Sequence, residues 1–310
     1  MMETHTLTLH DQRVLAFSEF GDMAGYPVFY AHGIPGSRLE GMLYHETALI
    51  EGIRLIAVDR PGVGQSGLQL HRNLLSCPVD IRALANHLEI EKFGVMGWSS
   101  GGAPALTCGF LIPSRVQIAV SLAGYTNFGE FSQARRLLEA LPLPGSTFTN
   151  KGRFALYGTT LIIELIEKHT PKLYFDHLLK ICCKPDRQIL EIPGIRETFM
   201  KVQDEAFRQG IEGLTDGLDI QYYDWGFSLK DIRVPVLIYQ GKKDTFVPYQ
   251  FAEHLHSIIP ESDLTILEDQ GHMFALSPVL QKRIFKKILS RVSQPQPVLT
   301  KSGSENCYSP

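Results

Sequence analysis

Short apolar runs rich in β-branched residues alternate along this chain with longer segments of helical periodicity. Apolar side chains occupy consecutive positions in these runs, which is typical of strands buried on both faces of a parallel sheet. The runs lie at 28–31, 55–58, 93–96, 118–122, 236–239 and 264–267. The helical segments between them lie at 79–88, 101–111, 249–258 and 279–292. Because right-handed crossovers connect parallel strands, the alternation predicts an α/β fold with a doubly wound, mostly parallel sheet.

Two departures from this alternation add to the picture. Near the beginning, the runs 6–9 and 14–20 flank Asp11-Gln12 and predict an antiparallel hairpin at the sheet edge. Between about 126 and 224, helical patterns follow one another without a convincing strand. They lie at 153–168, 173–182 and 195–208. Since ligands of open α/β sheets bind beyond the carboxyl ends of the strands, we interpret this insert as a lid; a helical layer with no site beneath it is the alternative.

The expected organisation is a core in two parts with an inserted helical cap. The core comprises residues 1–125 and 225–292, and the cap comprises residues 126–224. The segment 293–310 is rich in Pro and Ser and has little to bury, so we expect a flexible C-terminal tail.

The composition is that of an ordinary globular protein and excludes several classes. The chain has 310 residues, of which 44% are apolar and 20% charged. Its 30 basic and 33 acidic side chains give a net charge of −3, which argues against a nucleic-acid binder. No apolar run approaches the roughly 18 residues of a membrane span, and no secretory signal is readable. Five scattered cysteines fit reduced thiols of a cytoplasmic protein better than a disulfide framework.

The segment 93–102 is the most informative in the chain. It reads FGVMGWSSGG and holds Gly-x-Ser-x-Gly, with Ser99 directly between a predicted strand and a predicted helix. A serine at the tip of such a tight turn has a strained backbone, and the residues two positions away must lack side chains, which Gly97 and Gly101 do. The pattern alone is weak, but its strand–turn–helix context indicates a nucleophile at Ser99.

An acyl-transfer nucleophile also needs N–H donors aimed at the developing oxyanion. The strand 28–31 leads into His32-Gly33-Ile34-Pro35-Gly36, a glycine-rich loop that can turn its amides toward a site. Pro35 has no N–H, so we expect the N–H of Ile34 to act with that of Ser100. A structural turn is the alternative for this loop, and His32 is expected to brace it rather than to catalyse.

A serine hydroxyl further needs a base and an orienting carboxylate. Asp244 follows the strand 236–239, and His272 follows the strand 264–267. Ser99, Asp244 and His272 thus come in the Ser…Asp…His order of one hydrolase architecture, each at a strand–helix junction along one sheet edge. Asp269 and Asp224 are the carboxylates that compete with Asp244 for this role.

With these motifs the chain resembles the α/β-hydrolase fold family, and most of all its lidded serine hydrolases. The segments that carry the resemblance are HGIPGSR at 32–38, DRPGVGQS at 59–66, GWSSGG at 97–102, GKKD at 241–244 and GH at 271–272. The resemblance implies Ser99 as nucleophile, His272 as base, Asp244 as acid, and Ile34 with Ser100 as oxyanion donors. It covers about residues 6–292 and says little about the substrate.

The resemblance also disfavours some activities. Proline aminopeptidases of this fold usually read His-Gly-Gly-Pro-Gly and Gly-Gly-Ser-Trp-Gly, whereas this chain has Ile34 and Gly-Trp-Ser-Ser-Gly. Haloalkane dehalogenases and epoxide hydrolases have Asp in place of Ser99. We therefore expect a serine hydrolase of the carboxylesterase type acting on a small-molecule acyl substrate, with no partner nucleic acid. A ligand receptor with slow turnover and a triad-dependent lyase or acyltransferase are the alternatives.

No cofactor or metal is implied by the sequence. Residues 62–67 read Gly-x-Gly-x-x-Gly, but the dinucleotide fingerprint places its glycines at a strand end where a helix opens, and here Arg60 and Pro61 intervene. No spacing of His and Cys suits zinc. Apolar residues of the insert, which are Leu161, Ile162, Ile163, Leu165 and Ile166, fit either an apolar substrate pocket or internal packing of the lid.

Overall fold

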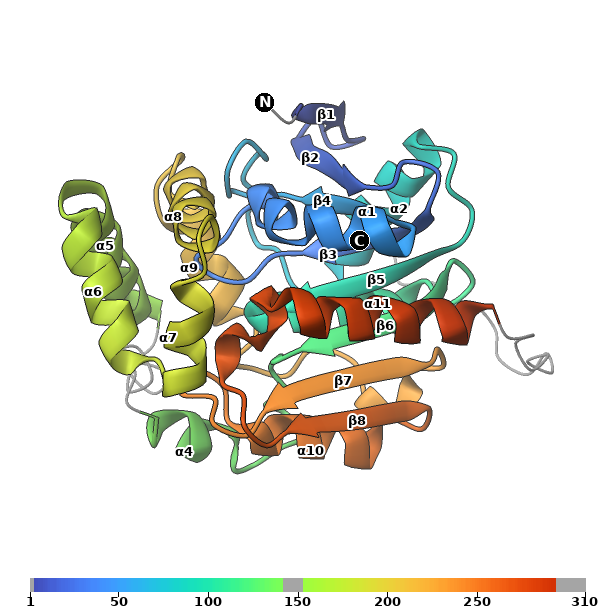
Figure 1. Cartoon of the computed structure of the whole chain (residues 1–310). Coiled ribbons are helices and arrows are strands. Elements are labelled where there is room, and N and C mark those ends of the chain that lie inside the picture. The colour runs from blue at the N-terminus through green and yellow to red at the C-terminus, as the bar shows by residue number, and fades with distance from the viewer. Residues whose placement is uncertain (1–2, 142–152, 294–310) are drawn as a thin grey trace.

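An eight-stranded sheet in the order β1-β2-β4-β3-β5-β6-β7-β8 organises the chain (Figure 1). The computed structural model describes residues 3–141 and 153–293. The strands are β1 (His5–Thr8), β2 (Val14–Gly21), β3 (Tyr26–Ala31), β4 (Ile53–Val58), β5 (Phe93–Trp98), β6 (Val116–Leu122), β7 (Val236–Gly241) and β8 (Ser262–Leu267). Strands β1 and β2 pair antiparallel, β2 joins β4 antiparallel, and the remaining pairs are parallel.

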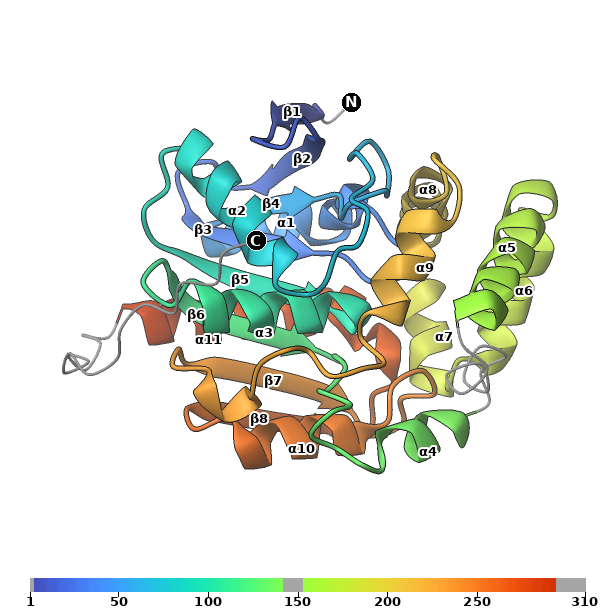
Figure 2. The same cartoon turned by 180° about the vertical axis from the view of Figure 1, so that it is seen from behind.

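Helices cover both faces of this sheet. In the core they are α1 (His45–Glu51), α2 (Ser76–His87), α3 (Gly102–Leu111), α10 (Tyr249–Ile258) and α11 (Pro278–Val292). Helices α1 and α11 lie in front of the sheet in Figure 1, and α2 and α3 lie in front of it in Figure 2. Alternate residues of one strand divide between the two layers: Val28 and Tyr30 pack with α11, whereas Phe29 packs with α2 and α3. This two-sided burial is why the strands consist of continuous apolar runs.

Between β6 and β7 the described chain forms helices. They are α4 (Ala134–Glu139), α5 (Arg153–His169), α6 (Pro171–Ile181), α7 (Lys184–Leu190), α8 (Ile195–Ala206) and α9 (Glu212–Asp219). Figures 1 and 2 show α5 to α9 together beyond one end of the sheet. That end carries the carboxyl termini of the strands, because Ser37 in the loop after β3 bonds to Val202 O of α8 at 2.9 Å. The described helices α5 to α9 thus lie beyond the carboxyl ends of the strands.

The sheet, its order of strands and the hairpin confirm the α/β fold expected from the sequence. One detail of the burial was wrong: β8 is half-buried along its length, because an edge strand has a neighbour on one side only. The short helices α1, α4, α7 and α9 have no counterpart among the expected elements. Each has eight residues or fewer, so its periodicity is too brief to stand out.

Further expectations concern the cap surface and the cysteines. In α5, Leu161, Ile162, Leu165 and Ile166 are exposed, so internal packing of the lid is wrong for these four residues. Cys77, Cys108, Cys182 and Cys183 are free, whereas Cys307 and nearly all of the expected tail at 293–310 lie outside the described residues. No described helix is both long and apolar enough to cross a membrane.

Candidate active site

Ser99 lies on a tight turn between β5 and α3, and its backbone has a φ of 54°. A non-glycine residue in this left-handed region is uncommon and costs conformational energy. Glycines make the turn possible, since a Cβ on Gly97 would clash with the carbonyl oxygen of Gly101, and a Cβ on Gly101 with that of Ala31. The Gly-x-Ser-x-Gly spacing is therefore a steric requirement of this turn.

His272 and Asp244 are in direct contact. They follow the neighbouring parallel strands β8 and β7, and His272 Nδ1 donates to Asp244 Oδ2 at 2.7 Å. The backbone N–H groups of Phe246 and Val247 donate to the other oxygen of Asp244 at 2.7 and 2.9 Å. Gln240 Nε2 donates to Oδ2 at 2.8 Å. These donors hold the buried carboxylate in one orientation, which in turn orients the imidazole ring.

Trp98 connects the serine turn to the histidine loop. Its ring lies 5.3 Å from that of His272, and its Nε1 donates to the carbonyl of His272 at 3.2 Å. Ser99 is the next residue in the chain. Its hydroxyl makes no hydrogen bond in the described part of the chain, so the structure brings Ser99 to the neighbourhood of His272 without joining the two directly. Such hydrogen bonds are often long in unliganded sites and tighten when substrate binds.

Asp186 is a residue of this site that the sequence reasoning missed. It lies on α7 in the inserted helices and is fully buried. Its carboxylate accepts hydrogen bonds from the backbone N–H groups of His272 at 2.9 Å and Met273 at 2.8 Å. The inserted segment thereby holds the loop that carries the histidine. No sequence motif marks Asp186, because its partner lies 86 positions away.

The charges around His272 set its protonation equilibrium. Burial by itself lowers the pKa of this imidazole. The negative charge of Asp244 and the hydrogen bond to it act in the opposite direction, with smaller contributions from Asp186 and Glu40. The pKa of His272 is therefore raised above its ordinary value of 6.5.

The loop after β3 approaches the serine turn because β3 and β5 are parallel neighbours, with Ala31 opposite Gly97. A Cβ on Gly33 would lie 3.4 Å from the Cβ of Ser99. The backbone N–H groups of Ile34 and Ser100 find no acceptor among the described residues. Both expected oxyanion donors thus remain available for an acceptor supplied from outside the chain.

Two buried side chains brace this loop. His32 Nδ1 donates to Gly33 O at 2.7 Å, and His32 Nε2 accepts from the backbone N–H of Arg60 at 3.1 Å. This is the bracing position expected of His32. Glu40, which the sequence reasoning missed, accepts from Gly33 N at 3.1 Å and from the Tyr30 hydroxyl at 2.7 Å. Burial raises the pKa of Glu40 to about 7.

The side chain of Ser100 forms hydrogen bonds with two other polar side chains, Arg60 and Gln221. Arg60 Nη1 donates to both the carbonyl and the hydroxyl of Ser100 at 3.0 Å. Gln221 Nε2 donates to the same hydroxyl at 2.7 Å. The side chain of Ser100 is thus engaged in structure, while its N–H stays free. Neither Arg60 nor Gln221 was expected at the site.

The competing carboxylates lie elsewhere. Asp269 is 87% exposed at its side chain and pairs with Lys243 at 2.7 Å. Asp224 Oδ1 accepts from the N–H of Gly226 at 2.7 Å in an exposed turn. Only Asp244 among the three lies against His272 in the described structure.

The glycine-rich loop 62–67 lacks the strand-to-helix geometry of a dinucleotide site. The loop 62–67 opens no helix, since α2 begins at Ser76. Instead Asp59, fully buried, accepts from Gln65 N at 2.9 Å and forms an ion pair with Arg38 at 2.6 Å. In the described chain, no group of three or more His, Cys, Asp or Glu side chains could hold a metal ion.

Comparisons with known proteins identify the family. Residues 26–278 match the family model described as the alpha/beta hydrolase fold. The chain is 28% identical over 270 residues to the dihydrolipoyllysine-residue acetyltransferase component of the acetoin cleaving system of Pseudomonas putida, covering 87% of this chain and 64% of that protein. It is 26% identical over 257 residues to an AB hydrolase superfamily protein of Bacillus subtilis, covering 80% of this chain and 85% of that protein.

A solved structure shares the fold of this chain. An esterase from Exiguobacterium antarcticum superposes with a TM-score of 0.66 at 21% identity, covering 93% of this chain and 99% of that one. At this identity the likeness concerns the fold alone. Because the family model spans most of the chain, this protein belongs to the α/β-hydrolase family. It is thus a member of a hydrolase enzyme family.

Proposed function

We propose that this protein is a serine hydrolase that cleaves a carboxylic ester or a related acyl bond of a small molecule. Ser99 is the nucleophile, His272 the base and Asp244 the orienting acid. The observation that carries the proposal is the contact of 2.7 Å between His272 and Asp244, next to the strained turn that bears Ser99. A buried imidazole held by a carboxylate beside such a turn is the arrangement that activates a serine.

The reaction would follow the acyl-enzyme route. Ser99 Oγ attacks the acyl carbon while its proton moves to His272 Nε2, and Asp244 stabilises the imidazolium through Nδ1–H. The N–H groups of Ile34 and Ser100 hold the oxyanion. When the intermediate collapses, His272 gives its proton to the leaving alcohol and the acyl group stays on Ser99. Water then attacks this ester with His272 as base, and a second collapse releases the acid and returns the proton to Ser99.

A series of p-nitrophenyl esters of increasing acyl length tests this function. We expect multiple turnovers by the wild type and none above background by Ser99→Ala. A reactive phosphonate ester should label Ser99, and peptide mass spectrometry would locate the label. Labelling on another residue, or equal turnover by Ser99→Ala, would overturn the proposal. The preferred acyl length also decides whether the pocket is apolar, and a single burst without turnover would indicate a slow-turnover receptor instead.

Acyl transfer is a second candidate, because the relative from Pseudomonas putida carries an acetyltransferase name. The chain spans less than two thirds of that relative, at 64%. The same acyl-enzyme could pass its acyl group to a thiol or alcohol in place of water. Adding such acceptors to the ester assay and quantifying the acylated product against free acid separates the two. Hydrolysis that is unaffected by acceptors supports the hydrolase.

A further inference from the structure

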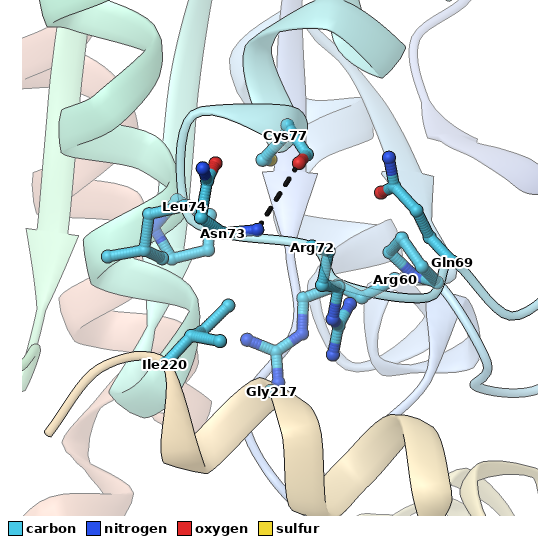
Figure 3. Close-up of a pocket in the computed structure, with 11 residues that line it drawn as sticks. Arg60, Gln69, Arg72, Asn73, Leu74, Cys77, Gly217 and Ile220 are labelled. Atoms are coloured by element: carbon cyan, nitrogen blue, oxygen red, sulfur yellow. Dashed lines mark hydrogen bonds between the residues drawn. The ribbon is translucent and has the colours of Figure 1, made fainter. Parts of the chain in front are cut away.

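A small cavity lies beside Arg60, the residue that donates to Ser100. Its volume is about 30 Å³, and it is enclosed by the loop before α2, the first turns of α2 and α3, and helix α9. Figure 3 shows two arginines, Arg60 and Arg72, reaching toward Gly217 of α9. Asn73, Cys77 and Ile220 complete much of the remaining wall.

The two guanidinium groups converge on one point. A Cβ placed on Gly217 would lie 2.9 Å from Arg72 Nη2 and 3.1 Å from Arg60 Nη2. Because glycine has no side chain, no side-chain atom of residue 217 lies between the two guanidinium groups. The Cδ1 atom of Ile34 would lie 3.0 Å from the same Cβ. Both residues proposed as oxyanion donors are neighbours of the cavity wall: Ile34 lies close to Gly217, and Ser100 accepts a hydrogen bond from Arg60.

Several buried donors here lack partners. Arg60 is only 5% exposed, yet its Nε and Nη2 atoms make no hydrogen bond within residues 3–141 and 153–293, and neither does Nε of Arg72. Arg72 donates from Nη2 to the carbonyl of Gly213 at 2.7 Å. The buried Oε1 atom of Gln69 is also unpartnered, and a half-turn of this amide would present its NH₂ group instead. The polar atoms of the wall are thus mainly donors, and the rest of the wall is apolar, with Pro61, Leu74 and Pro104 among its residues.

The charge of this pair is not neutralised by contact. Neither Arg60 nor Arg72 forms an ion pair in the described part of the chain. The charges of Cys77 and Glu40 raise the pKa of Arg60, and those of Asp216, Cys77 and Asp80 raise that of Arg72. Asp80 already receives both of its close hydrogen bonds from Arg13, at 3.0 and 2.8 Å. Burial, and then mutual repulsion, lowers the pKa of Arg60 to about 9. Unpaired buried cations are costly, and an anion between them relieves that cost.

We propose that Arg60 and Arg72 form a binding site for a carboxylate-sized anion. One water molecule needs roughly 10–15 Å³ of cavity volume. The cavity volume of about 30 Å³ therefore accommodates a carboxylate or one small inorganic ion and excludes larger groups. Planar forked guanidinium groups are suited to carboxylates. The anion comes either free from solution or as a carboxylate of the substrate. The second source rests on the proposed function and makes the substrate an ester that also carries a negative charge.

Melting temperatures test the site without any assay of activity. Sodium formate is titrated at constant ionic strength maintained with sodium gluconate, whose anion is too large for the cavity. We expect formate to raise the Tm of the wild type by roughly 3 to 6 °C at saturation. Arg72→Gln should weaken the apparent formate affinity by about tenfold or more, since hydrogen bonds to a charged group are lost. Equal melting in formate and gluconate would show that the cavity holds water only.

Gly217→Ala provides a test that keeps both arginines. Its methyl group would occupy the space where the guanidinium groups meet, whereas alanine favours the helix. We expect this variant to fold and to lose the formate response. Gly158→Ala in α5 is the matched control, because no atom lies within 4 Å of its Cβ. A formate response of Gly217→Ala equal to that of Gly158→Ala would overturn the site.

Kinetics separate the two sources of the anion. If the substrate supplies the carboxylate, mono-p-nitrophenyl esters of dicarboxylic acids should be preferred over neutral esters of equal length. Formate should then inhibit their hydrolysis competitively, and Arg72→Gln should abolish the preference. If the anion is free, formate raises the Tm but no such preference exists. A formate response without esterase activity would refute the proposed function and keep the site, whereas esterase activity without a formate response would do the reverse.

Discussion

Asp186 of helix α7 accepts a hydrogen bond at 2.9 Å from the backbone N–H of His272. The loop that carries the proposed base is therefore held by the inserted helices, not only by the core. Asp186→Asn keeps one acceptor but sets an NH₂ group against a second N–H, so we expect kcat to fall by about tenfold. Because the charge of Asp186 also raises the pKa of His272, the acid limb of the pH profile should move to lower pH.

Asp176→Asn, on the exposed surface of α6, is the control for this variant. It should change neither kcat nor the pH profile. An Asp186→Asn variant with a lower Tm but an unchanged pH profile would mean that Asp186 has a structural role alone.

The second prediction concerns the pH dependence of the wild type. His272 acts as a base only when neutral, and its pKa in the folded protein lies above 6.5. We therefore expect kcat/KM to increase with pH through an apparent pKa above 6.5, with low activity below it. Steady-state rates from pH 4 to 9 measure this. Full activity at pH 4 would contradict a histidine base.

The third prediction separates Ser99 from Ser100. Ser99→Ala should lose on the order of 10⁴-fold or more in kcat, as removal of a triad nucleophile does. Ser100→Ala keeps its N–H, so most activity should remain. It removes the hydroxyl acceptor, but Arg60 still donates to the Ser100 carbonyl and Gln221 to the Gly217 carbonyl, so the free energy of unfolding should fall by only about 0.5–1.5 kcal/mol. Rates and urea unfolding of both variants check this, and an inactive Ser100→Ala with an active Ser99→Ala would reverse the assignment.

The fourth prediction compares two carboxylates. Asp244→Asn should lower kcat by roughly 10⁴-fold, because its amide favours the wrong imidazole tautomer. Asp269→Asn is the matched control: its only described partner is the exposed Lys243, so its kcat should stay near that of the wild type. If Asp269→Asn is the inactive variant, the proposed acid is wrong.

The fifth prediction concerns the buried Glu40. Its pKa is about 7 when folded, against 4.5 ordinarily, so the folded state binds its proton more tightly than the unfolded chain does. The stabilisation of the folded state by this proton is complete below about pH 4.5 and is lost as the pH rises through about 7. Its loss between about pH 5 and pH 8 should lower the free energy of unfolding by about 2–3 kcal/mol.

Glu40→Gln cannot titrate, so its free energy of unfolding should decrease less over the same range. The groups that face Glu40 are Tyr30, Tyr44, Arg60 and His272, and they are present in both proteins. Urea unfolding at pH 5 and pH 8 measures the difference. Parallel pH profiles for the two proteins would contradict a titrating Glu40.

The sequence by itself determined the parts of this protein whose cause is local. Continuous apolar runs mark buried parallel strands, and the glycines around Ser99 mark a turn that other residues cannot make. Since the carboxyl ends of parallel strands lie at one edge, the position of Ser99, Asp244 and His272 after predicted strands led us to expect them in the same region.

Only the tertiary structure decided which side chains meet across that edge. Asp244 contacts His272, whereas Asp269, three positions from the histidine, points to solvent and to Lys243. Asp186, Glu40 and Arg72 lie outside the motifs read in the sequence, and the motif that contains Arg60 did not reveal its contact with Ser100. Their partners lie on other elements, and no period or motif records such a contact. Whether a charge is paired depends on the packing of α7 and α9 against the loops of the sheet, which exists only in the folded chain.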